Sequence, residues 1–222
     1  MYPTGNLFIP VAHGQLEAIW KEPNKGLQRG VALVLHPHPL GGGTMHNKVV
    51  FHAARALNDS GVATLRINFR GVGQSTGTHD EGRGEVDDVR AGLDHLAQKF
   101  SDQHITVCGF SFGARVGLEV GIADARVSNL ISIGTPLEKY DFEFIAQCRK
   151  PILFVHGELD EFGQASDLRK LVAQLPPELT TLVVIKDAGH FFEDRLEEMK
   201  AAIKNWVTDQ LGASHRDAGS GL

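Results

Sequence analysis

One stretch of the sequence carries the residue types that nucleophilic catalysis requires. Ser111 lies in Gly109-Phe110-Ser111-Phe112-Gly113, which follows the apolar run ITVC and precedes a run that reads as helix. A G-x-S-x-G pattern between a strand and a helix is typical of a nucleophile elbow. A serine on so sharp a turn has strained backbone angles, and the flanking glycines avoid collisions with the neighbouring strand and helix. The turn lifts the hydroxyl above the sheet, close to helix N–H groups that can stabilise an oxyanion.

A serine hydroxyl is a poor nucleophile unless a base accepts its proton and an acid orients that base. The base that we predict is His190, in DAGHFF, between the last apolar run and the last helical segment. The acid candidates are Asp160 and its neighbours Glu158 and Glu161, in the loop that leaves the preceding strand. Without these partners, G-x-S-x-G would equally fit an ordinary loop serine.

Composition favours a single enzyme-sized domain. The 222 residues are 42% hydrophobic and 22% charged, and the formal net charge of −5, with scattered Lys and Arg, excludes a general attraction to nucleic acid or anionic membranes. Two cysteines, Cys108 and Cys148, make neither a disulfide framework nor a zinc site. We found no signal peptide and no apolar run of the roughly 20 residues that a membrane span needs, so we expect a cytoplasmic protein without membrane or nucleic-acid partners.

Strands and helices alternate along the whole chain. We predict strands at 7–10, 16–20, 31–35, 63–69, 105–108, 130–133, 152–155 and 182–185, and helices at 48–58, 85–100, 165–175 and 195–211, with a further helix after Ser111. This pattern predicts an α/β protein with a mostly parallel sheet and helices on both faces, in one domain over residues 1–211. Residues 212–222 read as a disordered tail. Active sites of such sheets lie at the carboxyl ends of the strands, where the candidates above fall.

Six motifs carry a resemblance to a known family: LHPHPLGGGTMHNKVV, LRINFRGVGQSTG, GEVDDVRAGLDHL, GFSFGA, HGELD and DAGHFF. The chain resembles the α/β-hydrolase superfamily up to about Leu211, and most of all small, capless bacterial esterases and dienelactone-hydrolase-like enzymes. The resemblance implies the α/β-hydrolase fold and the order Ser111, Asp160, His190 for the catalytic residues. Its H-G-x-x-D spacing favours Asp160 as the acid. Dienelactone hydrolases use a cysteine nucleophile, so Ser111 favours ester chemistry.

An oxyanion hole in such a protein uses two backbone N–H groups. One should be that of Phe112, the residue after the nucleophile. The other should come from the loop HPHPLGGG, in which Pro37 and Pro39 have no N–H to donate. His38 and Leu40 remain, and the resemblance to His-Gly-x loops of esterases favours His38.

The connection 134–151 is too short for a cap domain in addition to a parallel crossover. We therefore expect an open cleft that binds a small or medium ester. The walls that we predict are Leu40, Met45, Pro136, Tyr140, Phe142 and Phe162. The function predicted is that of a carboxylesterase acting through an acyl-enzyme. A thioesterase, an amidase or a peptidase would use the same residues, and a non-catalytic binding module on a hydrolase scaffold is the alternative from another class.

Other patterns carry weaker signals. The histidines 36, 38, 46 and 52 could suggest a metal site, but no acidic or cysteine ligand accompanies them, and we predict neither metal nor cofactor. GVGQSTG has a threonine at the third glycine position of a dinucleotide fingerprint, which favours a structural turn. The segment 7–20 predicts a hairpin at the sheet edge, and an open edge could support a homodimer.

Overall fold

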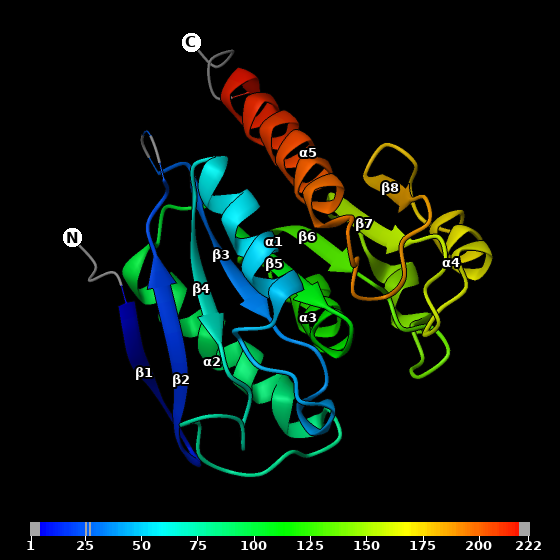
Figure 1. Ribbon diagram of the computed structural model, residues 1–222. Coiled ribbons are helices and arrows are strands. Elements are labelled where there is room, and N and C mark those ends of the chain that lie inside the picture. The colour runs from blue at the N-terminus through cyan, green and yellow to red at the C-terminus, as the bar shows by residue number, and fades with distance from the viewer. Residues whose placement is uncertain (1–4, 25, 27, 218–222) are drawn as a thin grey trace.

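A single eight-stranded sheet runs through the computed structural model, which describes residues 5–24, 26 and 28–217 (Figure 1). Its strands lie in the order β1-β2-β4-β3-β5-β6-β7-β8. The strand β2 pairs antiparallel with both β1 and β4, and all pairs from β4 to β8 are parallel. The bounds are β1 Gly5–Val11, β2 Gly14–Lys21, β3 Gly30–Leu35, β4 Val62–Ile67, β5 Ile105–Phe110, β6 Val127–Ile133, β7 Ile152–Gly157 and β8 Thr180–Ile185.

Helices cover both faces of this sheet (Figure 1). The helices α1 and α5 pack together on one face, α2 and α3 pack together on the other, and α4 lies beside β8. Their bounds are α1 Lys48–Asp59, α2 Arg83–Lys99, α3 Phe112–Ala123, α4 Ala165–Val172 and α5 Leu196–Asp217, with short 3-10 helices η1 at Pro39–Gly41 and η2 at Glu143–Gln147.

The strand β3 shows why the sheet is buried on both sides. Leu33 and Leu35 belong to the core beneath α2 and α3, whereas Ala32 and Val34 belong to the core beneath α1 and α5. Successive side chains of a strand point to opposite faces, so a strand between two helical layers needs an unbroken apolar run. VALVL is such a run, and the α/β prediction is confirmed.

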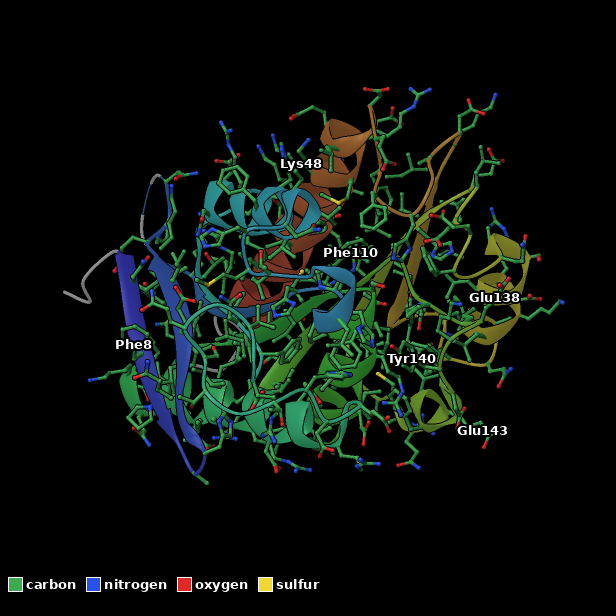
Figure 2. The ribbon with its side chains drawn as sticks, turned by 60° about the horizontal axis from the view of Figure 1, so that its bottom comes forward. Phe8, Lys48, Phe110, Glu138, Tyr140 and Glu143 are labelled. Carbon is green, nitrogen blue, oxygen red and sulfur yellow. The ribbon has the colours of Figure 1, made fainter. Side chains whose placement is uncertain are left out.

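The hairpin of β1 and β2 forms one edge of the sheet, as predicted. Phe8 on β1 is 45% exposed. In Figure 2, Phe8 lies at the left edge of the molecule, well separated from Tyr140, which follows β6. Whether this open edge supports a dimer stays a prediction.

Several boundaries differ from those that the sequence predicts. The helix α4 ends at Val172 rather than Leu175, and β4 ends at Ile67 rather than Phe69. The helix α5 continues to Asp217, into the segment that the sequence analysis expects to be a disordered tail. Residues 218–222 of that tail lie outside the described residues.

The connection from β6 to β7, residues 134–151, joins two neighbouring parallel strands directly. Because η2 is its only helix, the carboxyl end of the sheet is not covered by a cap domain. Among the described helices, none combines the length and the apolar character that crossing a membrane demands.

Candidate active site

Ser111 lies at a sharp turn between β5 and α3. Its backbone angles, φ 56° and ψ −118°, are ones that a residue with a side chain seldom adopts. Its N–H donates to the carbonyl of Ile133 at 2.9 Å, which ties the turn to β6. A Cβ at Gly109 would lie 2.3 Å from the carbonyl oxygen of Gly113, and one at Gly113 would lie 2.6 Å from that of His36. Both glycines are therefore needed where three backbone segments meet.

A chain of hydrogen bonds runs from this serine to a buried carboxylate. Nε2 of His190 lies 2.9 Å from Oγ of Ser111, and Nδ1 lies 3.0 and 2.9 Å from the two carboxylate oxygens of Asp160. His190 and Asp160 are each only 3% exposed. With its proton on Nδ1, the imidazole donates to Asp160 and leaves Nε2 to accept from the serine hydroxyl.

The neighbouring acids of the β7–α4 loop make other contacts. Oε2 of Glu161 accepts from the backbone N–H of His190 at 3.3 Å, and Oε2 of Glu158 accepts from the backbone N–H of Asp187 at 3.1 Å. Asp160 also accepts from the N–H of Phe162 at 2.9 Å, which holds its carboxylate in place. Of the three acids, Asp160 alone contacts the imidazole ring.

Aromatic rings and one glycine fix the orientation of the His190 ring. Its centroid lies 4.9 Å from that of Phe110 and 4.6 Å from that of Phe162. Gly134, with φ 55°, follows β6, and a Cβ there would lie 3.1 Å from Cε1 of His190. The sequence analysis missed Gly134, because nothing in the local pattern indicates that a ring from the β8–α5 loop packs on it.

The β8–α5 loop itself holds His190 by an unusual backbone path. Asp187, Phe192 and Asp194 all have positive φ, between 54° and 61°. Non-glycine residues adopt this region rarely and at a cost in free energy. The strain surrounds His190 and is compensated by packing of the buried Phe192 against the core beneath α1 and α5.

The two backbone N–H groups that the sequence predicts for an oxyanion hole differ in what the structure shows of their surroundings. Phe112 is the first residue of α3, so its N–H has no acceptor within the helix. Among the described residues, no acceptor pairs with the N–H of His38, whereas the N–H of Leu40 donates to Nδ1 of His38 at 3.2 Å. The side chain of Leu40 is 78% exposed. Of the two candidates in this loop, His38 is therefore the free donor.

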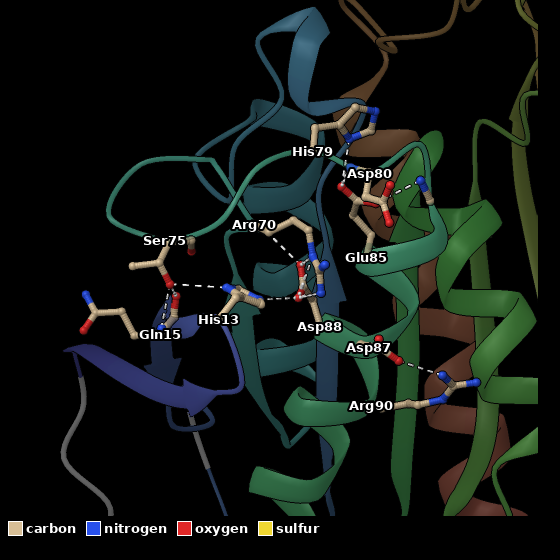
Figure 3. A network of polar contacts seen from close by, with 12 residues as sticks. His13, Gln15, Arg70, Ser75, His79, Asp80, Glu85, Asp87, Asp88 and Arg90 are labelled. Atoms are coloured by element: carbon tan, nitrogen blue, oxygen red, sulfur yellow. Dashed lines mark hydrogen bonds and ion pairs between the residues drawn. The ribbon is translucent and has the colours of Figure 1, made fainter.

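A polar network anchors the long loop between β4 and α2 (Figure 3). The fully buried Asp88 on α2 accepts from Nη2 of Arg70 at 2.8 Å and from Nε2 of His13 at 3.1 Å. Nδ1 of His79 donates to the buried carboxylate of Glu85 at 2.8 Å. These contacts join the β1–β2 turn and the loop to one face of α2.

Through His79, the network reaches His38. The ring centroid of His79 lies 4.8 Å from that of His38, which in turn lies 5.1 Å from that of Phe112. Burial, and then the neighbouring His79, lower the pKa of His38 below its ordinary value. Nδ1 of His38 is the acceptor for the N–H of Leu40, and this contact maintains the turn of the loop.

Ser111 and His190 open into a cavity of about 370 Å³. Of the walls that the sequence predicts, Pro136, Tyr140 and Phe162 line it. Further lining residues, which the sequence analysis did not name as walls, are Pro37, Gly41, Gly42, Gly43, Asn47, Lys139 and Phe191. Lys139 also lies over the ring of Phe162, 5.7 Å from its centroid.

Three predicted walls do not line this cavity. Met45 is fully buried, with its N–H bonded to Asn68 and its carbonyl to Arg66. Phe142 is 4% exposed and belongs to the core beneath α2 and α3. Leu40 points to solvent outside the cavity. The apolar character of these side chains could not reveal whether each one faces the core, the cavity or solvent.

The described residues contain no group of three or more histidine, cysteine or acidic side chains placed to hold a metal ion. His36, one of the four histidines of this region, is fully buried after β3. Its Nε2 accepts from the N–H of Phe69 at 3.0 Å, and its Nδ1 donates to the carbonyl of Pro37 at 2.6 Å. Both ring nitrogens of His36 therefore make hydrogen bonds that hold the start of the loop over residues 36–43.

The fold and this arrangement are those of the α/β hydrolases, and comparison with known proteins agrees. The profile of the alpha/beta hydrolase domain matches residues 30–211. The chain belongs to this family.

Three relatives illustrate the family. An uncharacterized protein of Rickettsia prowazekii is 39% identical over 196 residues, which are 84% of this chain and 82% of that protein. An alpha-beta serine hydrolase homologue from Coxiella burnetii is 36% identical with a TM-score of 0.87, covering 92% of this chain and 99% of its own. XC6422 from Xanthomonas campestris, described as a serine hydrolase without lid, is 34% identical with a TM-score of 0.86, covering 95% and 97%.

The crowding at the elbow predicts that Gly113→Ala is destabilising. The new Cβ would meet backbone oxygens of Leu35 and His36, which cannot move without shifting β3. We expect a loss of about 1–3 kcal/mol in the free energy of unfolding, measured by denaturant titration. The control is Gly41→Ala, whose Cβ would meet only Cβ of His38 at 3.8 Å. Equal stabilities for the two variants would contradict the argument.

Burial of His36 predicts a pH dependence of stability. Burial lowers the pKa of His36 from 6.5 to about 4, so the unfolded chain binds more protons between these values. The contribution of His36 to the free energy of unfolding should be complete above pH 6.5. It should be lost as the pH falls toward 4, which lowers the free energy of unfolding by up to about 3 kcal/mol. Denaturant titrations of the wild type and of His36→Gln would measure this. An identical pH slope in both proteins would rule out His36 as the source.

Proposed function

We propose that this chain is a carboxylesterase that cleaves small to medium esters through a serine acyl-enzyme. The observation that supports the proposal is the hydrogen-bonded chain Asp160–His190–Ser111, which opens into a cavity that His38 also lines. The second proposed oxyanion donor, the N–H of Phe112, directly follows Ser111 at the start of α3. Nucleophile, base, orienting acid and oxyanion donors are the four components of acyl transfer by a serine.

The first half of the proposed reaction forms the acyl-enzyme. Nε2 of His190 takes the hydroxyl proton while Oγ of Ser111 attacks the ester carbonyl. The N–H groups of Phe112 and His38 donate to the negative oxygen of the tetrahedral intermediate. As the intermediate collapses, the imidazolium protonates the departing alcohol, and Asp160 stabilises the positive charge that His190 carries in between.

In the second half, water replaces the alcohol. His190 accepts a proton from the water as its oxygen attacks the acyl carbonyl, and then returns the proton to Oγ of Ser111. The carboxylic acid leaves and the free serine is restored. The buried surroundings of His190 and Asp160 strengthen their interaction because the local dielectric constant is low.

Ser111→Ala tests the proposal most directly. We expect kcat for a soluble ester to fall by at least about 10⁴-fold, because the nucleophile is lost while the fold is kept. Intact mass after exposure to a fluorophosphonate should show one adduct on the wild type, which peptide mapping assigns to Ser111, and none on the variant.

An unchanged circular dichroism spectrum and melting temperature serve as the folding control for Ser111→Ala. Near-full activity in the variant would contradict the assignment of Ser111. A well-folded wild type that fails to react with the fluorophosphonate would favour a binding module on a hydrolase scaffold instead.

The cavity predicts the substrate range. Its volume of about 370 Å³ is at the lower end of the range, about 300–1,000 Å³, of small-molecule sites, and its walls include the rings of Tyr140, Phe162 and Phe191. We expect kcat/KM to be highest for short and medium acyl chains, without a rise in rate at a lipid–water interface, because no cap has to open.

A panel of soluble p-nitrophenyl esters of increasing acyl length, compared with triglyceride emulsions, would measure this preference. Strong preference for long-chain triglycerides would contradict it. Matched ester, thioester and amide substrates with the same acyl group separate the proposed reaction from those of a thioesterase and an amidase. The ester should have the highest kcat/KM.

A further inference from the structure

A second cavity, of about 280 Å³, lies between β2, β4 and α1, away from Ser111. Its charged lining residues are Lys21, Arg55 and Arg66, and no carboxylate lines it. All three cationic side chains contribute positive charge to the same small volume. Such a lining is unfavourable unless an anion occupies it or solvent screens it.

Arg66 is the unusual member of this group. It lies on β4 and is only 8% exposed, yet it forms no ion pair with any described residue. Nη1 donates to the carbonyl of Met45 at 2.8 Å, and Cζ lies 5.7 Å from the ring centroid of Phe51. An arginine carries five N–H donors, so most of them stay available to a ligand in the cavity. Burial lowers the pKa of Arg66.

Lys21 and Arg55 complete the charged lining from two other elements. Both are exposed, and neither forms an ion pair with a described residue. Asp59, which follows the lining residue Asn58, does not itself line the cavity: it accepts from the lining residue Asn24 at 2.6 Å and lies 3.7 Å from Nζ of Lys204. The side chains that line the cavity therefore carry only positive charges.

We propose that this cavity binds a small ligand that carries a phosphate group. A guanidinium offers a planar pair of donors that matches phosphate oxygens, and a phosphate group carries about −1.5 to −2 charges at pH 7, which suits three cations better than a single carboxylate does. The volume of 280 Å³ leaves room for a small organic substituent beside Phe51, which is 46% exposed.

Isothermal titration calorimetry of the full chain tests this site, in a buffer free of phosphate and at low salt. The probes are inorganic phosphate, glycerol 3-phosphate and acetate. We expect one saturable site per chain for the phosphate compounds and at least tenfold weaker binding of acetate. Tighter binding of the ester would assign a phosphate ester as the ligand, and tighter binding of the free ion would assign inorganic phosphate. Both outcomes support the site.

Variants that remove one or two of the positive charges locate the binding. Arg66→Gln should abolish it, and the double variant Lys21→Gln/Arg55→Gln should weaken it at least tenfold. The matched control is Arg90→Gln, because Arg90 is exposed on α2, pairs with Asp87 at 2.8 Å and does not line this cavity.

Should Arg66→Gln fail to fold, the double variant decides, since both of its side chains are exposed. Absence of saturable binding by the wild type would overturn the proposal. So would tighter binding of acetate than of phosphate, unchanged binding by the double variant, or an equal loss in Arg90→Gln. The measurement involves no hydrolysis, so its outcome is independent of the proposed esterase function.

Discussion

The close approach of backbone segments around Ser111 is the constraint on which the site depends. The end of β5, the start of α3 and the end of β3 meet at distances that leave no space for a Cβ at Gly109 or Gly113. The hydrogen bond from Ser111 to Ile133 adds β6 to this junction. A serine with φ 56° persists because the surrounding sheet and helix hold it there.

The partners of this serine depend on equally tight packing from loops far away in the sequence. His190 is held by Asp160 on one side and by the rings of Phe110 and Phe162 on others. The parallel order of β5, β6, β7 and β8 brings these loops to one edge of the sheet. The order of the strands in the sheet therefore determines which side chains contact the imidazole ring of His190.

The opposite wall of the site rests on polar rather than apolar contacts. Asp88 and Glu85, both fully buried on α2, hold the β4–α2 loop through arginine and histidine side chains. That loop supports His38 through ring contacts. Buried carboxylates are tolerable only when they are paired, so this network also fixes the loop in one arrangement.

The sequence by itself determined the strand–helix order, the elbow at Ser111, the position of His190 and the absence of room for a cap. Each of these depends on local residue types or on lengths of chain, which the linear order contains. The residue types alone also excluded Pro37 and Pro39 as oxyanion donors, because proline has no backbone N–H.

Only the tertiary structure decided between candidate residues that lie close together in the sequence and could each serve the same role. It distinguished Asp160 from Glu158 and Glu161, separated the free N–H of His38 from the engaged N–H of Leu40, and buried Met45 and Phe142 away from the cavity. It also brought Arg66 to a cavity without a carboxylate. The direction and the partners of a side chain depend on contacts between distant segments, and local spacing does not encode those contacts.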